Sequence, residues 1–150
     1  MTPPQDTRVI DVLNGLIRTL KDGEEGFRIA ADALRDEQIE ELFRRYVEQR
    51  RRFAGELRRE IERLGGKPGN TGTLTGAAHR GWINIKAAVT GGQEEAIIAE
   101  CERGEDAAKR AYEEALDAGL SGEPRTLITR QCAEITASHD RIRSLERTHS

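Results

Sequence analysis

Four long stretches of this 150-residue sequence repeat apolar residues every three to four positions, which places those residues along one face of an α-helix. Short polar or glycine-containing breaks separate the first stretch from the second and the third from the fourth, whereas residues 65–92 separate the middle two. The spacing predicts long helices over residues 7–35, 37–64, 93–118 and 123–147. This pattern, two closely joined helix pairs with one long connection between them, limits the possible folds more than any other feature of the sequence.

The long connection determines how the helices run. A tight turn makes neighbouring helices antiparallel, and a long connection that recrosses the bundle lets the second and third long helices run parallel. Within it, apolar residues at helical spacing predict a short helix over about residues 73–89, with Trp82 plugging the flank of the bundle. We therefore predict an all-α, ferritin-like four-helix bundle with one long crossover that contains a short helix. We expect residues 1–150 to form a single domain of this kind.

Composition and charge limit the classes of partner. Charged residues make up 34% of the chain and aromatic residues 4%, which is typical of helices with solvated outer faces. The net charge of −3, from 24 basic and 27 acidic residues, gives no bulk field that attracts nucleic acid or an anionic membrane. The sequence has no recognisable signal peptide and no apolar run near the roughly 18 residues of a membrane span. We expect a cytoplasmic protein.

The second stretch is rich in arginine and invites a nucleic-acid interpretation. Its arginines are Arg44, Arg45, Arg50, Arg51, Arg52, Arg58, Arg59 and Arg63. Glutamates are interleaved with them, and the pairs Glu40–Arg44, Glu41–Arg45 and Glu48–Arg52 have the spacing and order that stabilise a helix. A solvated, self-paired face is therefore favoured over a nucleic-acid stripe. We predict no nucleic-acid or membrane partner, leave a homodimer open, and cannot name a protein partner.

A polar residue interrupts the apolar stripe near the middle of each long helix. The interruptions are Glu24, Gln49 or Arg50, Glu105 with Glu102 just before it, and His139. The first hairpin turns near residues 36–37, which places Glu24 opposite Gln49. The second turns near residues 120–121, which places Glu102 opposite His139 and Glu105 one turn away. The interruptions are therefore predicted to meet in matching layers.

Two hypotheses explain these interruptions, because ionised groups are costly to bury unless they are paired or bind a metal. In the favoured one, Glu24, Arg50, Glu105 and His139 form a charge network that fixes the helix register. In the other, Glu24, Glu102, Glu105 and His139 hold a divalent iron, manganese or zinc ion. The sequence leaves open whether Gln49 or Arg50 faces the core. The choice matters, because glutamine is compatible with a nearby metal and arginine argues against one.

Other reactive residues do not form a known catalytic pattern. Cys101 lies on the apolar stripe, and the register separates it from Cys132, so we expect no internal disulfide. The sequence contains no G-x-S-x-G motif, phosphate loop or Cys-His nucleophile pair, and we predict no catalytic or cofactor-binding residue. His79 and Arg80 on the connection are expected at the surface, and His149 in a frayed tail.

Four runs of the sequence resemble a known family. The runs are HRGWINIKAAVTG (79–91), ECERGEDAAKRAYEEAL (100–116), VIDVLNGLIRTLKDGEEGFRIAA (9–31) and ASHDRIRSLE (137–146). They are similar to an uncharacterised bacterial family of ferritin-like four-helix-bundle proteins, a domain of unknown function. The resemblance implies a ferritin-like bundle. It implies little about activity, because the family is described by its fold.

The wider ferritin-like group supplies a test for a di-iron centre. Its di-iron members use a glutamate from each of two helices and an E-x-x-H motif from each of the other two. On this resemblance, Glu24 or Glu25 could stand for the first glutamate, and Glu102 or Glu105 for the second.

The two E-x-x-H motifs are absent. Glu48 is followed three residues later by Arg51, and His139 is preceded three residues earlier by Thr136. We therefore predict a non-catalytic structural or interaction role, with a stress response as one setting. The alternative is a metal-binding ferritin-like protein with a degenerate carboxylate–histidine site in the bundle core.

Overall fold

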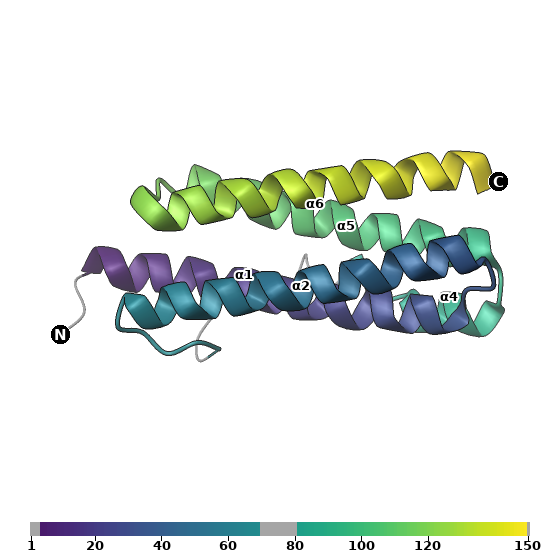
Figure 1. The fold of residues 1–150 in the computed structure, drawn as a ribbon, viewed down its shortest axis with the longest axis horizontal. Coiled ribbons are helices and arrows are strands. Elements are labelled where there is room, and N and C mark those ends of the chain that lie inside the picture. Colours follow the sequence, from purple (N-terminus) through teal and green to yellow (C-terminus); the bar gives the residue numbers. More distant parts are fainter. Residues whose placement is uncertain (1–3, 70–80, 150) are drawn as a thin grey trace.

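The protein, seen in a computed structural model, is described over residues 4–69 and 81–149, and in these ranges it contains helices and no strand. The helices are α1 (Pro4–Ala33), α2 (Glu37–Arg63), α4 (Ile85–Gly91), α5 (Glu94–Asp117) and α6 (Gly122–His149) (Figure 1). The ends of the four long helices lie within a few residues of the predicted ends. Residues 73–80 of the predicted crossover helix lie outside the described residues, and over the rest of the prediction α4 begins at Ile85.

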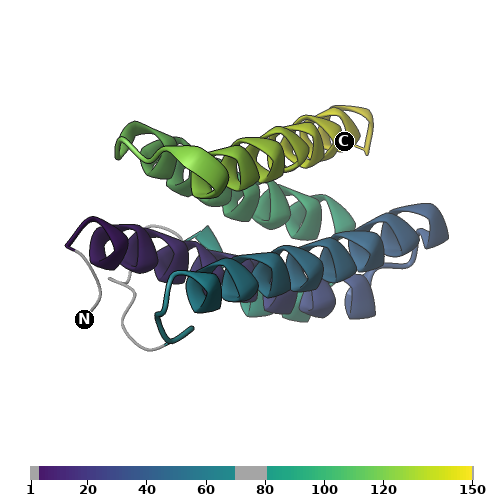
Figure 2. The ribbon, with the colours of Figure 1, turned by 60° about the vertical axis from the view of Figure 1, so that its left-hand side comes forward.

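The two hairpins pack as the connection lengths predict. α1 and α2 are antiparallel, α5 and α6 are antiparallel, and α2 and α5 run in the same direction across the molecule (Figure 1). The α5–α6 hairpin lies against the α1–α2 hairpin in both views (Figure 2), and α1 and α5 make most of the contact between the two hairpins. This is the predicted one-crossover bundle.

The turn between α1 and α2 is held by two carboxylates. Asp36 caps α2, because its Oδ1 accepts hydrogen bonds from the backbone N–H groups of Gln38 and Ile39 at 3.0 and 3.2 Å. Glu94 of α5 reaches the same turn, where its Oε2 accepts from the backbone N–H groups of Arg35 and Asp36 at 2.7 and 3.2 Å. The start of α5 is thereby fixed to the end of the first hairpin.

Apolar side chains form two clusters along the bundle. One contains Leu13, Leu57, Tyr112 and Ile128, toward the end where α2 finishes and α6 begins. The other contains Phe27, Phe43, Trp82, Ile98 and Ile142, toward the end where α2 and α5 begin. A layer of buried polar side chains crosses the bundle between them.

Trp82 joins the crossover to the bundle, as predicted. Its indole is buried between α1 and α5 and lies 5.0 Å, centroid to centroid, from the Phe27 ring. The fit requires glycine on both helices. A Cβ on Gly26 would lie 2.2 Å from the indole, and a Cβ on Gly104 would lie 2.1 Å from it.

Candidate functional site

Three consecutive residues of α5 face three different parts of the molecule, because successive residues of an α-helix are about 100° apart. Gly104 lies against Trp82 of the crossover. Glu105 points into the centre of the bundle, where it meets Arg50 of α2. Asp106 points to the edge between α5 and α6, where it meets His139. The central pair and the edge cluster are the two polar sites considered below.

The central pair is a fully buried ion pair. Both side chains have an exposed fraction of 0%. The Arg50 guanidinium donates two parallel hydrogen bonds to Glu105, from Nη1 to Oε1 at 2.5 Å and from Nη2 to Oε2 at 2.7 Å. Gly23 of α1 makes room for it, since a Cβ there would lie 3.3 Å from Nη1. Such two-point charged contacts are strong only when the geometry is good and the remaining donors are used.

The remaining contacts of Arg50 complete its environment. Its Nε donates to Oε1 of Gln49 at 3.1 Å, and its guanidinium lies 5.3 Å from the centre of the Phe27 ring. Burial disfavours the charged form of Arg50, but the adjacent Glu105 carboxylate more than offsets this and raises the pKa of Arg50. The structure thus answers the open question: Arg50 faces the core and Gln49 lies beside it.

A second, uncharged polar pair lies in the core two turns further along α5. The Tyr112 hydroxyl donates to Oε1 of Gln131 at 2.7 Å. The Gln131 amide in turn donates to Oε1 of Glu56 at 2.9 Å, and Glu56 pairs with Arg130 at 3.0 Å on the outer face. Burial raises the pKa of Tyr112 far above its ordinary value. This chain of hydrogen bonds links the core to solvent.

The edge cluster contains a buried imidazole and three carboxylates, two on α5 and one on α6. His139 has a side-chain exposure of 5%, and its Nε2 lies 2.6 Å from Oδ1 of Asp106. Its Nδ1 lies 3.2 Å from Oδ1 of Asp140. Glu102 precedes Asp106 by one helical turn, and one ligand atom from each of Glu102, Asp106 and His139 lies within 4.8 Å of the other two. This donor set is of a kind that could hold a metal.

The four residues predicted as one metal site are divided among three places. Glu105 lies in the core, and Glu102 and His139 lie at the edge. Glu24 lies on the outer face, with a side-chain exposure of 30%, and pairs with Arg51 at 3.1 Å. The prediction that Glu24 belongs to the buried layer is wrong, because the inward position on this turn of α1 is Gly23.

In the second hairpin Glu102 lies close to His139, as predicted, but the direct contact is made by another residue. His139 meets Asp106, one turn beyond the Glu102 that was predicted opposite it. Sequence reasoning therefore missed Asp106 as a site residue. The available signal was its spacing, since residues four apart on a helix share a face and Asp106 follows Glu102 by four.

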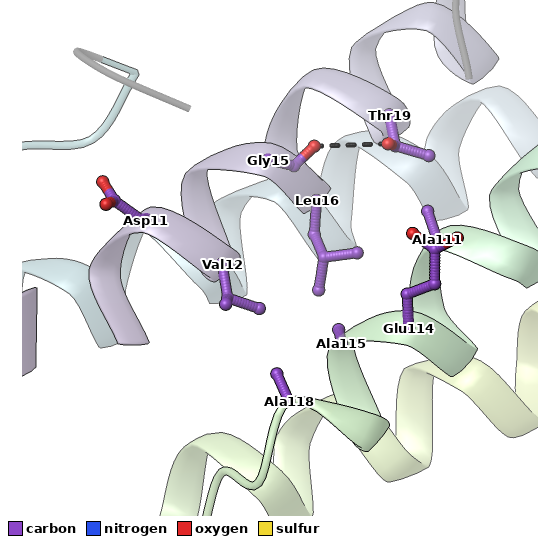
Figure 3. A pocket seen from close by; sticks show the side chains of 9 residues that line it. All are labelled: Asp11, Val12, Gly15, Leu16, Thr19, Ala111, Glu114, Ala115 and Ala118. Atoms are coloured by element: carbon purple, nitrogen blue, oxygen red, sulfur yellow. Dashed lines mark hydrogen bonds between the residues drawn. The ribbon is translucent and has the colours of Figure 1, made fainter. Parts of the chain in front are cut away.

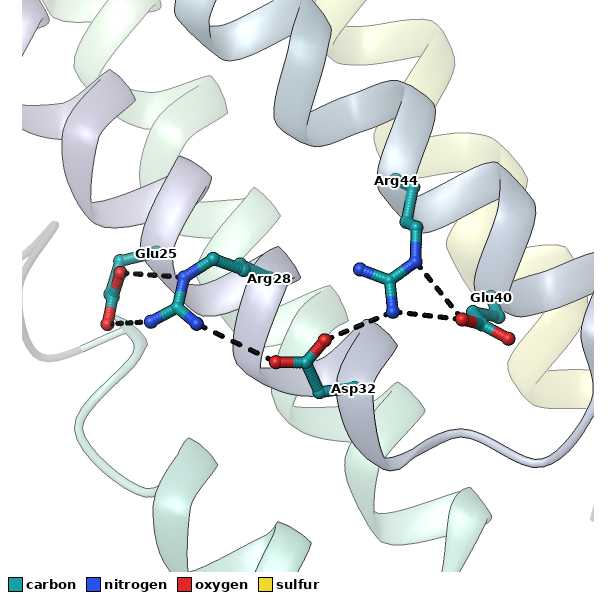
Figure 4. Close-up of polar contacts among 5 residues, drawn as sticks. All are labelled: Glu25, Arg28, Asp32, Glu40 and Arg44. Carbon is teal, nitrogen blue, oxygen red and sulfur yellow. Dashed lines mark hydrogen bonds and ion pairs between the residues drawn. The ribbon is translucent and has the colours of Figure 1, made fainter.

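Five of the eight arginines of α2 are in ion pairs, whereas Arg45, Arg58 and Arg59 are not, so the predicted Glu41–Arg45 pair is absent from the described residues. Glu25, Arg28, Asp32, Arg44 and Glu40 form a continuous row of ion pairs across α1 and α2 (Figure 4). The predicted Glu40–Arg44 pair is present at 2.9 Å, whereas Glu48 pairs with Arg51 instead of Arg52. No helix in the described ranges has the length and apolarity needed to cross a bilayer.

Two surface pockets lie away from the two polar sites. One, of about 200 Å³, is a shallow apolar groove between α1 and α5 (Figure 3). It is lined by Asp11, Val12, Gly15, Leu16, Thr19, Ala111, Glu114, Ala115 and Ala118. A larger one, of about 480 Å³, lies at the end of the bundle near Arg8 and Arg63. Neither is lined by Glu105 or His139.

Both cysteines are free thiols. Cys101 is buried as predicted, and burial together with the Glu105 charge raises its pKa well above the ordinary value. Cys132 is half-buried on α6, and partial burial raises its pKa as well. His79 and Arg80 fall outside the described residues, as does the side chain of His149.

Comparison with known proteins supports the fold and leaves the activity unassigned. Residues 8–118 match the family described as "Domain of unknown function (DUF2383)". No curated protein matches the sequence. Among solved structures, a mutant of Mycobacterium smegmatis Dps1 matches with a TM-score of 0.72 at 15% identity, covering 99% of this chain and 99% of that chain. At this identity the likeness shows the fold alone, which is the predicted all-α ferritin-like bundle.

Proposed function

The chain belongs to the family described as a domain of unknown function (DUF2383), and within it we propose a non-catalytic ferritin-like protein with a structural or interaction role. The observation that carries the proposal is the buried ion pair between Arg50 and Glu105. It lies in the middle of the bundle, where di-metal ferritin-like proteins gather their inward carboxylates and histidines.

The central residues do not fit a di-metal centre. Arg50 places a permanent positive charge in the core, 2.5 Å from the carboxylate that a metal would need. Both oxygens of Glu105 already accept hydrogen bonds from that guanidinium. A cation could use Glu105 only by displacing Arg50, which would leave a buried charge without its partner at a cost of about 3–5 kcal/mol.

The other buried groups of the core support the same interpretation. Tyr112 and Gln131 satisfy each other, and burial keeps the hydroxyl of Tyr112 and the thiol of Cys101 protonated at neutral pH. A protonated thiol is a poor nucleophile and a poor metal ligand. We infer that these groups fix the helix register and stabilise the fold. The interaction role of the protein is therefore expected at its surface, and self-association is one such role.

Ferrous oxidation tests the proposal at the centre. Purified full-length protein without an affinity tag is mixed with ferrous iron in air, and oxygen consumption is compared among wild type, Glu105→Gln and Asp106→Asn. We expect all three to match buffer. Oxidation faster than buffer that is lost in Glu105→Gln and kept in Asp106→Asn would contradict the proposal, because it would assign redox chemistry to the centre.

Light scattering coupled to size-exclusion chromatography tests the surface role. The chain has a mass of 16.7 kDa, so a self-associating protein elutes with a multiple of that mass that depends on loading concentration. A constant monomer mass would remove self-association from the proposal and direct attention to other partners.

A metal-binding role is the second candidate, and one observation favours it. The His139 imidazole lies beside Asp106 and Glu102 at the edge of the bundle, away from Arg50. Carboxylate oxygen and imidazole nitrogen together suit zinc, manganese and iron. Unlike the predicted core site, this candidate requires no change in the central pair.

A further inference from the structure

The edge cluster has an arrangement that an ion pair alone does not require. Two carboxylates one turn apart on α5 face a single imidazole on α6, and their ligand atoms lie within 4.8 Å of one another. Asp106 would suffice as a partner for His139, since Nε2 and Oδ1 lie only 2.6 Å apart. Glu102 adds a second negative charge at the same point, with a side-chain exposure of 20%.

The second ring nitrogen of His139 is held in the manner of a metal ligand. Its Nδ1 lies 3.2 Å from Oδ1 of Asp140, and that carboxylate can accept the Nδ1 proton. With the proton on Nδ1, this hydrogen bond would leave the Nε2 lone pair available to a metal, whereas the present 2.6 Å contact with Asp106 requires a proton on Nε2. Metal-binding histidines in proteins commonly carry such a carboxylate on the other nitrogen.

The local charge is negative when His139 is neutral. Glu102, Asp106 and Asp140 contribute three negative charges, and Arg143 contributes one positive charge. The Arg143 contact is loose, with Nε 3.9 Å from Oε1 of Glu102 and a side-chain exposure of 57%. An incoming cation can displace this guanidinium into solvent, in contrast to the guanidinium of Arg50 in the core.

We propose that Glu102, Asp106 and His139 bind one divalent transition-metal ion at the edge of the bundle, with Asp140 as a positioning residue. The proposal deepens the second candidate function and does not depend on the first. Bonds of about 2.1 Å place tetrahedral ligand atoms about 3.4 Å apart. Asp106, with a side-chain exposure of 44%, rotates outward from its present 2.6 Å contact to reach that spacing. Water fills the position that faces solvent.

Metal binding replaces a hydrogen bond with coordination. The proton between Nε2 and Asp106 is either released to solvent or replaced by one on Nδ1. In the second case, Nδ1 donates a hydrogen bond to Asp140. The ion then takes one bond from Nε2 and one from each of two carboxylates. Because binding requires a deprotonated Nε2, the affinity falls as the pH is lowered. The imidazole ligand favours zinc or iron over magnesium, which prefers oxygen ligands alone.

Calorimetric titration of chelator-treated, full-length, untagged protein with zinc tests the proposal. We expect one equivalent bound by wild type and no comparable binding of magnesium. Asp106→Asn and His139→Gln should weaken zinc binding by at least about 100-fold, and Asp140→Asn by about 10–100-fold, the usual range for a residue that orients a ligand. Glu24→Gln, which alters an acidic residue outside the cluster, should bind like wild type.

Two further variants address other histidines and loss of folding. The chain has three histidines, so the double variant His79→Gln/His149→Gln should keep the full zinc affinity. Arg143→Ala removes the competing cation and should tighten zinc binding about two- to fivefold, the range expected for a surface charge contact. Because this variant is expected to gain affinity, unfolding cannot imitate the result.

The proposal is overturned by any of three results. These are no zinc binding by folded wild type, binding unaffected in folded Asp106→Asn and His139→Gln, or binding that disappears in His79→Gln/His149→Gln. None of these results bears on the central pair. Ferrous oxidation at the centre would contradict the first candidate and leave the edge site to be judged by the zinc titration.

Discussion

Glu105 and Asp106 are neighbours on α5, yet their carboxylates occupy opposite kinds of environment. Glu105 has no exposed side-chain surface and is held at two points by a guanidinium. Asp106 has a side-chain exposure of 44% and contacts an imidazole at one point. Rotation by about 100° along one helix therefore separates the centre of the bundle from its edge.

The difference shows what burial does to the use of a carboxylate. In the centre, the charge is tolerated only because Arg50 neutralises it and Gly23 leaves space for the guanidinium. Such a carboxylate is committed to the fold. At the edge, solvent lowers the cost of leaving a carboxylate unpaired, so Asp106 can exchange partners. The centre is thus built for stability, and the edge is the place where we propose that a metal ion binds.

Removal of the central carboxylate should have the largest effect. Glu105→Ala leaves the Arg50 charge buried without a partner, and we expect it to lower the free energy of unfolding by about 3–5 kcal/mol. Asp106→Ala is the matched comparison, because it removes a half-exposed carboxylate and leaves only the neutral His139 nitrogen without a partner, at a smaller cost of about 1–3 kcal/mol. Urea unfolding followed by circular dichroism measures both. Equal losses in the two variants would abolish the distinction between centre and edge.

The residue before Glu105 extends the comparison to the crossover. In Gly104→Ala the new methyl group overlaps the indole of Trp82, and we expect a loss of about 1–3 kcal/mol, as for other overpacked cores. Gly55→Ala on α2 is the control, since its nearest neighbour is the flexible end of Arg59 at 3.9 Å. Alanine there should be neutral or stabilise the helix by up to about 1 kcal/mol.

Tryptophan fluorescence distinguishes displacement of the indole from general loss of stability. Trp82 is the one tryptophan in the chain. Its emission should shift to the red in Gly104→Ala and stay unchanged in Gly55→Ala. Unchanged emission in the folded Gly104→Ala variant would show that the crossover does not depend on this close approach.

The uncharged core pair should contribute less than the charged one. Tyr112→Phe leaves Oε1 of Gln131 without its donor, and we expect a loss of about 1–3 kcal/mol in the free energy of unfolding at neutral pH. Burial raises the pKa of Tyr112 above its ordinary value of 10.0, so the folded state favours the protonated hydroxyl. Stability should therefore fall as the pH rises above about 10, where the unfolded chain loses this proton and the folded protein keeps it.

The alkaline fall in stability should be smaller in Tyr112→Phe than in wild type. Free energies of unfolding from urea titrations at a series of pH values give the comparison. Parallel curves for the two proteins would show that Tyr112 titrates normally in the fold, contrary to its buried hydrogen bond.

The smallest expected effect is a difference between the two cysteines in the rate at which a thiol reagent labels them. We expect a thiol reagent at mildly alkaline pH to label half-buried Cys132 quickly, and to label Cys101 only as fast as the core opens, because burial keeps that thiol protonated and inaccessible. The Cys132→Ser variant should lose the fast phase and keep the slow one. A single rate for both thiols would indicate that the centre is as accessible as the edge.

The helices and their directions could be predicted from the sequence, because apolar spacing and connection lengths leave few alternatives. The contacts of individual polar residues could not. The predicted register uses residue numbers alone and ignores the direction of the side chains, which lean toward the N-terminus of their own helix. In an antiparallel hairpin this shifts side-chain contacts to higher-numbered residues. Glu24 therefore meets Arg51 instead of Gln49, and the direct partner of His139 is Asp106, one turn beyond Glu102.

Glycine explains the remaining error. The sequence shows several charged residues at the middle of α1, and Glu24 is predicted for the buried layer because it lies four residues after Leu20 and three before Phe27. The structure instead uses Gly23, whose missing side chain admits Arg50 from the neighbouring helix. A glycine that only leaves room for a neighbouring side chain cannot be recognised from one sequence. The burial of Glu105, in contrast, could be predicted from its place on the apolar stripe.

A double-mutant cycle on Arg50 and Glu105 tests most directly the claim that the centre is one committed ion pair. Free energies of unfolding are measured for wild type, Arg50→Met, Glu105→Leu and the double variant. We predict that each single variant is strongly destabilised and that the double variant is more stable than either, because apolar residues of similar volume can replace a buried pair with little loss. Additive losses in the double variant would contradict the account.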